Sequence, residues 1–184
     1  GILACRDMLK GIRQVAVFDT AFHQTLPQKA CIYGLPYSFY QKDKIRKYGF
    51  HGSSHEYVAA EAAKRLTKDI AKVNLITCHL GNGCSITAIK NGKSVDTSMG
   101  FTPLEGLLMG TRSGDIDPAV VTYLIQKKKM PAASVDTLLN KESGLKGVSG
   151  ISNDMRKVMD AAKKGNAQAR LAIEIFIYRI QKYI

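Results

Sequence analysis

A short polar turn between two apolar runs is the first place where this chain could do chemistry. Residues 73–78 are apolar, residues 79–83 (HLGNG) interrupt them, and a second run begins at Ser85. Glycines on both sides of Asn82 would allow left-handed backbone angles and turn several N–H groups to one side, as in an anion-binding nest. The turn could hold a phosphate group, although a plain hairpin uses the same residues. It is neither a Walker loop nor a Rossmann fingerprint, because neither Gly-Lys-Ser/Thr nor a helix follows it.

Two charged residues stand where they could act on such a phosphate. Asp19 closes a short apolar run, residues 14–20, which is typical of a buried strand whose carboxyl end opens onto a cleft. The same aspartate could instead cap the turn that follows it. Arg112 lies in Gly-Thr-Arg-Ser-Gly, where flexible backbone can bring a planar, always charged group to an oxyanion. The alternative for Arg112 is a surface ion pair with Asp115.

Histidines are further candidates. Ser53 and Glu56 match a capping box, so we expect a helix to begin after Ser53 and to leave His51 in the loop before it. His51 and His55 have the spacing of a helical zinc pair, but only His55 would be helical, and the glutamate of a metalloprotease motif is absent. Hydrogen bonding is the commoner role of such histidines. A zinc hydrolase that uses His51, His55 and His79 is the alternative.

The elements that must position these residues follow from the hydrophobic pattern. Residues 73–78, residues 85–89 and the segment through Val95 predict three strands, with Asn91 and Gly92 as a hairpin turn. The C-terminal half reads as helical, with Asp117 as an N-cap before Pro118.

Further helices are predicted at residues 134–140, after Ser152 and after Asn166, with a glycine loop at residues 144–150. Apolar residues should form the buried faces of the last three long helices: Val121, Leu124 and Ile125; Met155, Val158, Met159 and Ala162; and Ala169, Ala172, Ile173, Phe176, Ile177, Ile180 and Ile184.

Length and composition limit the class of protein. A chain of 184 residues that is 45% apolar can form about one domain with a real core. No apolar run approaches the ~20 residues of a membrane span, and the four cysteines show no CxxC pairing, which predicts a cytoplasmic setting. The first residues resemble the tail of a helix, and the last apolar stripe has no stop signal, so we expect a fragment of a longer chain.

The net charge of +12 would suit an anionic partner. Lysines at helix ends explain much of this excess without a partner, although a nucleotide polyphosphate would use some of it. A basic nucleic-acid-binding module is an alternative that rests on the charge alone, because no recognition motif accompanies it.

Four motifs, VFDTAFHQTLP, YGFHGSSH, CHLGNGCS and GTRSGDIDP, closely resemble the acetate kinase family of the acetate and sugar kinase, Hsc70 and actin superfamily. Their order and spacing match over essentially the whole chain, as the middle of a longer family sequence. The resemblance implies an α/β fold with an incomplete ribonuclease-H-like domain and added helices. Residues 1–20 would be the tail of the N-terminal domain and an interdomain strand, and residues 21–184 the major part of the second, C-terminal kinase domain.

The resemblance also implies an activity: reversible transfer of the γ-phosphoryl group of ATP to acetate, giving acetyl phosphate and ADP. The implied cofactor is Mg²⁺ or Mn²⁺, and the implied state is a homodimer with neither nucleic acid nor membrane as a partner. Propionate or butyrate kinase activity is an alternative, because only part of the acyl pocket is present and one methylene is worth about 1–3 kcal/mol. Because other parts of the family's site lie outside these residues, we expect negligible turnover from the isolated chain.

Position by position, the resemblance assigns roles to individual residues. Asp19 matches an aspartate near the metal and acetate, Arg112 an active-site arginine, and His51 a histidine that hydrogen-bonds the transferring phosphoryl group. Phe50 and Pro103 match two walls of the pocket for the acetate methyl group. The phosphate-binding loop matches His79, Leu80, Gly81, Asn82 and Gly83. These residue types suit phosphoryl transfer, which depends on positioning and charge stabilisation.

Overall fold

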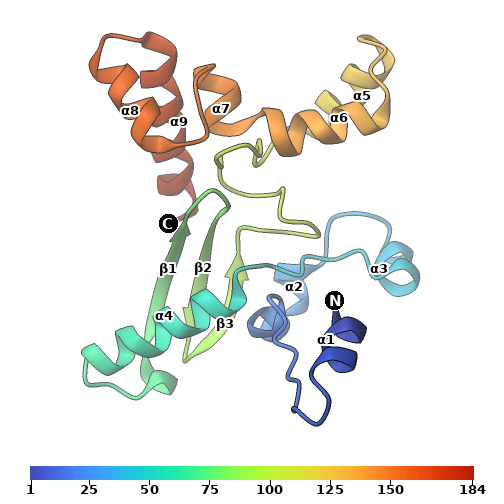
Figure 1. The fold of residues 1–184 in the computed structure, drawn as a ribbon, viewed down its shortest axis with the longest axis vertical. Helices are drawn as coiled ribbons and strands as arrows, with labels where there is room; N and C mark the ends of the chain where they lie inside the picture. The colour runs from blue at the N-terminus through green and yellow to red at the C-terminus, as the bar shows by residue number, and fades with distance from the viewer.

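A three-stranded antiparallel sheet lies at the centre of the computed structural model, which describes residues 1–184 (Figure 1). Strand β1 (Asn74–Leu80) pairs with β2 (Cys84–Lys90), and β2 pairs with β3 (Lys93–Thr97). Asn91 and Gly92 have φ angles of 52° and 74°, as a two-residue hairpin of the primed type requires. The three predicted strands and this hairpin are confirmed, but β1 continues through two residues that the sequence placed in the turn.

The sheet presents a polar face to helix α4 (Gly52–Arg65), which runs across β1. Residues opposite each other in an antiparallel pair share a face, so Thr77 and Thr87 lie on the same side as His79 and Ser85. Thr77, Thr87 and Ser85 are buried beneath α4. A row of buried hydroxyl groups is unusual under a helix, and it places polar chemistry inside the molecule.

Two apolar clusters stabilise the rest of the fold. Phe176 on helix α9 (Ala167–Tyr183) packs against both clusters, so α9 ties the C-terminal helices α7 (Gly144–Ser149) and α8 (Met155–Lys163) to the sheet. The first cluster, on the other face of β2, contains Cys84, Ile86, Met99, Leu107 and Met109. The second cluster contains Leu108, Leu145, Val158, Ala169 and Ala172.

The remaining elements are short. They are α1 (Ile2–Met8), η1 (Ala21–Thr25), α2 (Gln28–Cys31), α3 (Tyr37–Asp43), η2 (Ile70–Lys72), α5 (Pro118–Gln126), α6 (Ala132–Thr137) and the π-helical turn η3 (Leu138–Glu142). None of the helices is both long and apolar enough to cross a lipid bilayer.

The strand predicted at residues 14–20 is not formed. The segment carries no strand assignment, and the side chains of Val15 and Val17 are 85% and 77% exposed. An apolar run becomes a strand only when a neighbouring strand accepts its backbone hydrogen bonds, and no strand of this sheet lies beside it. The strand expected from this apolar run is therefore a wrong prediction for this structure, while the division into a domain tail with an interdomain strand and a second domain, at residue 20, stays a prediction.

Several helix starts also differ from the predictions. Helix α4 begins at Gly52 and not after Ser53, because His51 takes the N-cap position. Residues 144–150 form helix α7 and not a loop, and α8 begins after Asp154, whose carboxylate accepts a hydrogen bond from the backbone N–H of Arg156. The caps at Asp117 and Asn166 are confirmed, because a side-chain oxygen of each accepts a hydrogen bond from a backbone N–H in the first helical turn.

Helix α5 lacks the buried face that its sequence predicts. None of its residues is buried, because α5 packs mainly on α6 and both extend away from the sheet (Figure 1). The apolar stripes of α8 and α9 are buried only in part: Val158, Ala169 and Ala172 are buried, whereas Met159 and Ile177 are exposed.

Candidate active site

All four histidines of the chain meet beside the polar face of the sheet. The rings of His51 and His79 are stacked, with centroids 3.9 Å apart and planes 20° from parallel. The ring of His55 lies 6.4 Å from that of His79 and 5.8 Å from that of His23. Element η1 supplies His23, the start of α4 supplies His51 and His55, and β1 supplies His79. Sequence reasoning gave His23 no role, although this residue lies within the motif VFDTAFHQTLP.

Asp19 fixes the start of α4 from outside the helix. Its Oδ2 accepts a hydrogen bond from the backbone N–H of His51 (2.9 Å), and its carbonyl oxygen accepts one from the N–H of Gly52 (2.8 Å). His51 has a left-handed backbone (φ 58°), which these bonds help to hold. A Cβ on Gly52 would lie 2.4 Å from the Asp19 carbonyl oxygen, so only glycine fits this approach. Asp19 bonds to α4 and does not cap the turn that follows it.

Gly83 is the point where His51 and Arg112 meet. A Cβ on Gly83 would lie 3.2 Å from Arg112 Nη1 and 3.3 Å from His51 Nε2. Arg112 belongs to none of the ion pairs of the structure. The alternative of a pair with Asp115 is wrong, because that carboxylate accepts from the N–H of Gly106 (2.8 Å) and from the hydroxyl of Tyr183 (2.6 Å). The only hydrogen-bond partner of the guanidinium is the Met109 sulfur, at 3.9 Å, so most of its donors can serve an oxyanion.

The turn at residues 79–83 does not have the backbone conformation that the sequence predicted. Neither Gly81 nor Gly83 has a left-handed φ, so the predicted left-handed nest is wrong. The missing side chains provide space instead: at Gly83 for the histidine and arginine, and at Gly110 for Asn82. A Cβ on Gly110 would lie 2.1 Å from Asn82 Oδ1. The turn is held in place because the Asn82 carbonyl accepts from the Gly110 N–H (2.9 Å) and Asn82 Oδ1 accepts from Asn153 Nδ2 (2.9 Å).

A cavity of about 570 Å³ opens beside this turn, within the usual size range of small-molecule sites. At its rim, Arg156 and Asp154 form an ion pair of 2.7 Å. Sequence reasoning missed the contribution of residues 153–155, for which the only signal was a polar cluster ahead of a helix. The cavity is lined by Leu80, Gly81, Asn82, Leu145, Asn153, Asp154, Met155 and Phe176.

Burial favours the neutral form of three of these histidines, His23, His51 and His55. Burial lowers the pKa of His55 to about 3, and it lowers the pKa of His23 as well. Burial also lowers the pKa of His51, with a further contribution from the adjacent His79 ring. A neutral imidazole carries one N–H group and one acceptor nitrogen, so each ring can donate a single hydrogen bond.

The two predicted acyl-pocket residues occupy neighbouring loops. The Phe50 carbonyl bonds His23 Nε2 at 2.9 Å, and the Phe50 side chain packs on the first apolar cluster. Pro103 is half-buried in the loop that follows β3. That loop is joined to the Phe50 segment through the Gly100 carbonyl, which accepts from the N–H groups of Tyr48 (3.0 Å) and Gly49 (3.2 Å). These bonds hold the two loops together but do not place Pro103 against the histidines, so its role stays a prediction.

The histidine cluster does not form a zinc site. No group of three or more histidine, cysteine, aspartate or glutamate side chains is arranged to hold a metal ion. The Nδ1 atoms of the three zinc candidates bond hydroxyl groups at 2.8–2.9 Å and do not converge on one point. Mg²⁺ needs less from a protein, since it keeps several waters and takes one or two carboxylates with substrate phosphates. Asp19 fits that need, because His51 uses Oδ2 and Oδ1 is left for a ligand.

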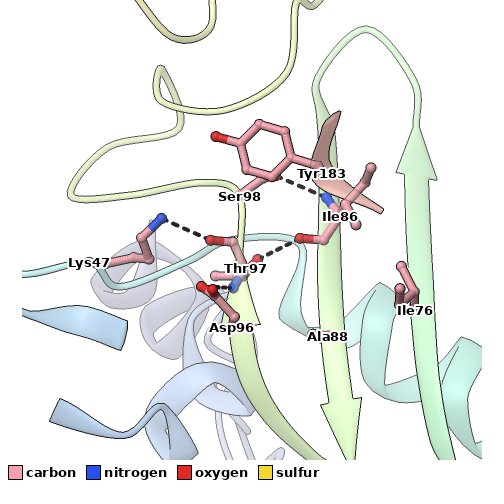
Figure 2. Close-up of a pocket in the computed structure, with 8 residues that line it drawn as sticks. All are labelled: Lys47, Ile76, Ile86, Ala88, Asp96, Thr97, Ser98 and Tyr183. Atoms are coloured by element: carbon pink, nitrogen blue, oxygen red, sulfur yellow. Dashed lines mark hydrogen bonds between the residues drawn. The ribbon is translucent and has the colours of Figure 1, made fainter. Parts of the chain in front are cut away.

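A second, smaller cavity of about 130 Å³ lies apart from these residues (Figure 2). Lys47 reaches into this region, donates to the Thr97 carbonyl (2.9 Å) and pairs with Glu105 (3.0 Å). None of the predicted site residues lines it, and its polar groups bond one another. Its lining consists of Lys47, Ile76, Ile86, Ala88, Asp96, Thr97, Ser98 and Tyr183.

Comparisons with known proteins agree with the geometry. Residues 1–184 match the model of the Acetokinase family. The chain is 61% identical over its whole length to the acetate kinase of Acetivibrio thermocellus and 60% identical to that of Halothermothrix orenii, and it covers 46% of each. It therefore spans about half the length of the curated relatives it matches.

Solved structures give the same result. A Porphyromonas gingivalis acetate kinase matches with a TM-score of 0.96 and 54% identity, over 100% of this chain and 46% of that one. A propionate kinase from Francisella tularensis matches with a TM-score of 0.95 and 53% identity, over 99% of this chain and 47% of that one. These matches confirm the expected fold class, an incomplete α/β domain of the kinase superfamily.

Proposed function

Because the chain belongs to the acetokinase family, we propose that it carries a large part of the site of a kinase that phosphorylates acetate. In this reaction a carboxylate oxygen of acetate attacks the γ-phosphorus of ATP, the bond to the β-phosphate oxygen breaks, and acetyl phosphate and ADP are formed. The kinase reaction is reversible. This activity would be that of the whole protein, and residues 1–184 would supply the part of its site that binds the phosphoryl group.

One observation carries the proposal: His51 Nε2, at the start of α4, and Arg112 Nη1, from the loop after β3, converge on Gly83. Because Gly83 has no side chain, two hydrogen-bond donors, one of them permanently charged, can approach the turn closely. Phosphoryl transfer needs donors of this kind, aimed at the oxygens on which charge is spread in the transition state. We assign the transferring phosphoryl group to the space over Gly83.

The remaining parts of the nucleotide would follow the turn away from this point. The polyphosphate would run along residues 79–83, and the nucleoside would enter the cavity of about 570 Å³ lined by Asn82 and Asn153. Asp19 would hold Mg²⁺ that arrives with the nucleotide, and the bound ion would supply charge neutralisation at the phosphates. The Asp19 carboxylate also accepts a hydrogen bond from the backbone N–H of His51. It would thereby orient the same histidine whose ring donates to the phosphoryl group.

The acyl group would lie between Phe50 and the loop that carries Pro103. Both loops are joined through the Gly100 carbonyl, which supports a shared pocket. Propionate is the second candidate substrate, because a propionate kinase from Francisella tularensis is nearly as similar in structure as the Porphyromonas gingivalis acetate kinase. We favour acetate, and we place the protein in the cytoplasm as a homodimer with the domain boundary at residue 20.

The experiment uses a chimera in which residues 1–184 replace the matching segment of the Acetivibrio thermocellus acetate kinase, which is 61% identical. Acetyl phosphate formation is measured as hydroxamate with acetate, propionate and butyrate. We expect kcat/KM to be highest with acetate and to require ATP. The isolated 184-residue chain should show negligible turnover. A chimera that folds and binds ATP but phosphorylates none of the three acids would contradict the proposal.

A further inference from the structure

A continuous chain of hydrogen bonds runs beneath α4 and ends at His51. Thr77 Oγ1 lies 2.8 Å from His55 Nδ1, and His55 Nε2 lies 2.7 Å from Ser85 Oγ. Ser85 Oγ in turn lies 2.9 Å from His51 Nδ1. Thr77, His55 and Ser85 are all buried, so protein groups alone decide how these bonds are made. The chain ends where the other ring nitrogen of His51 faces Gly83.

Each hydroxyl in this chain has one hydrogen, and each neutral imidazole has one N–H. Only two arrangements of hydrogens therefore satisfy all three bonds. In one, every hydrogen points toward His51, whose Nδ1 accepts and whose Nε2 carries the proton. In the other, every hydrogen points toward Thr77, and His51 Nε2 is an acceptor. The first arrangement offers a donor to the space over Gly83, and the second offers a lone pair that would repel a phosphoryl oxygen.

The distances around Thr77 favour the first arrangement. In the second, the hydrogen of Thr77 would have to go to the Thr87 carbonyl, which lies 3.5 Å away. That distance is beyond the usual range of about 2.5–3.0 Å for an O–H···O bond. In the first, the same hydrogen goes to His55 Nδ1 at 2.8 Å. The low pKa of His55, about 3, agrees with a neutral ring that relays one hydrogen bond.

His23 provides an internal comparison. Its Nε2 lies 2.9 Å from the Phe50 carbonyl oxygen, which can only accept, so the proton of His23 must be on Nε2. Its Nδ1 then accepts from the hydroxyl of Ser94 at 2.9 Å. A carbonyl fixes the tautomer of His23 directly. No hydrogen bond to a carbonyl fixes the tautomer of His51, which depends on Ser85.

We propose that Thr77, His55 and Ser85 are positioning residues that hold His51 as the Nε2–H tautomer, so that it donates a hydrogen bond over Gly83. The identity of the acceptor, a phosphoryl oxygen, rests on the proposed function. The tautomer itself does not, because it follows from bonds within the chain. Ser85 is the link that connects His51 to the other two residues.

The direct test is nuclear magnetic resonance of the 184-residue chain with ring-¹⁵N-labelled histidine at neutral pH. Two-bond ¹H–¹⁵N correlations distinguish the two neutral tautomers and the imidazolium. We expect the proton on Nε2 for His51, His55 and His23. A proton on Nδ1 of His51 in the unsubstituted chain would overturn the proposal, whatever the behaviour of any variant.

Kinetics of matched variants give a second test that does not depend on the isolated chain. In the chimera, Ser85→Ala should lower kcat about tenfold while KM for ATP and acetate changes less than twofold, because the loss concerns only the donor over Gly83. Ser85→Thr, which keeps the hydroxyl, should recover most of this loss. Ser94→Ala is the matched control, because it removes an equally buried serine hydroxyl from the Nδ1 of a different histidine.

The outcomes separate the two proposals. Equal losses from Ser85→Ala and Ser94→Ala, or no recovery with Ser85→Thr, would assign Ser85 a packing role and overturn the relay. An active chimera whose His51 carries its proton on Nδ1 would overturn the relay and leave acetate kinase activity intact. The reverse result, Nε2–H on His51 in a folded chimera without activity, would overturn the proposed function while the relay stands.

Discussion

The two faces of the central sheet bury different kinds of side chain, polar on one face and apolar on the other. Beneath α4 the buried groups are threonine and serine hydroxyls and histidine rings, and every buried side-chain nitrogen or oxygen of the structure has a hydrogen-bond partner. On the other face, Cys84 and Ile86 of β2 pack on Leu107 and two methionines with no polar group in the cluster. Consecutive residues of β2 contribute to both faces, because neighbouring side chains along a strand point to opposite sides of the sheet.

This difference indicates that the two faces contribute differently to stability and to function. A buried hydrogen bond adds only about 0.5–1.5 kcal/mol net, whereas removing one partner costs about 1–3 kcal/mol. Burial of apolar side chains contributes more, roughly 1.5–3 kcal/mol for each large one. The apolar face should therefore supply stability, and the α4 face should supply a fixed geometry of donors. Substitutions on the two faces should change different measurements.

Leu107→Ala should give the largest effect, and it should be on stability. Leu107 is fully buried in the first apolar cluster, so its truncation should lower the free energy of unfolding by about 2–5 kcal/mol. Urea unfolding of the 184-residue chain measures this loss. Leu171→Ala, at a side chain that is half-exposed on α9, is the control and should change stability by less than about 1 kcal/mol. Equal losses at the two positions would contradict the assignment of stability to the apolar face.

Arg112→Ala should have the complementary effect, on activity alone. Removing a donor aimed at transition-state charge costs about 10²–10³ in kcat, or about 2.7–4 kcal/mol. Arg112 forms no ion pair, so the midpoint of urea unfolding should hardly move. The chimera supplies the kinetic measurement, and Arg65→Ala, at an exposed arginine in the last turn of α4, is the control. Retention of full kcat would remove Arg112 from the site.

Gly83→Ala should produce a smaller loss that tests the space over the turn. Gly83 has no left-handed φ, so alanine is compatible with its backbone, but the added methyl would crowd Arg112 Nη1 and His51 Nε2 at 3.2–3.3 Å. Displacing both donors by a few tenths of an ångström should lower kcat about tenfold, equivalent to 1.4 kcal/mol. Gly34→Ala is the matched control, since a Cβ there meets nothing within 4 Å. An unchanged kcat would show that the reaction does not use this space.

The sequence predicted elements whose signals are local. Asn91 and Gly92 form a hairpin because both central residues need left-handed angles, and Asp117 and Asn166 cap helices because their side chains reach the next turn. The predicted strand at residues 14–20 failed for the opposite reason. Strand formation depends on a partner that no feature of the apolar run itself specifies.

The candidate site could be predicted only in part. The motifs pointed to Asp19, His51 and Arg112. The structure brings His51 and Arg112 together at Gly83 and bonds Asp19 to the backbone of His51, while their chemical roles stay predictions. Long-range hydrogen bonds were beyond sequence reasoning, as in the pair of His23 and Ser94, which are 71 residues apart. Glycine was ambiguous as well, because the same residue can serve a left-handed turn or simply leave room for a neighbour.

The smallest expected effect is a pH dependence of the free energy of unfolding, which should come from the polar face and not from the apolar face. The pKa of His55 is about 3 in the folded chain against 6.5 unfolded, so the unfolded state binds more protons as the pH falls below the unfolded value. Stability contributed by neutral His55 is therefore complete above about pH 7 and is lost progressively down to about pH 3. Between pH 7 and pH 6, where carboxylates do not titrate, His55 alone should account for a loss of about 0.7 kcal/mol. The lowered pKa values of His23 and His51 act in the same direction.

Urea unfolding at pH 7 and pH 6 measures this slope, and comparison of variants assigns it to one face. His55→Gln should reduce the slope by about the share of one histidine, whereas Leu107→Ala should lower stability equally at both pH values, because the apolar face contains no group that titrates in this range. A pH-independent stability of the unsubstituted chain would mean that the buried histidines accept protons as easily as exposed ones. The polar face would then be open to water in solution, and the contrast between the two faces would not hold.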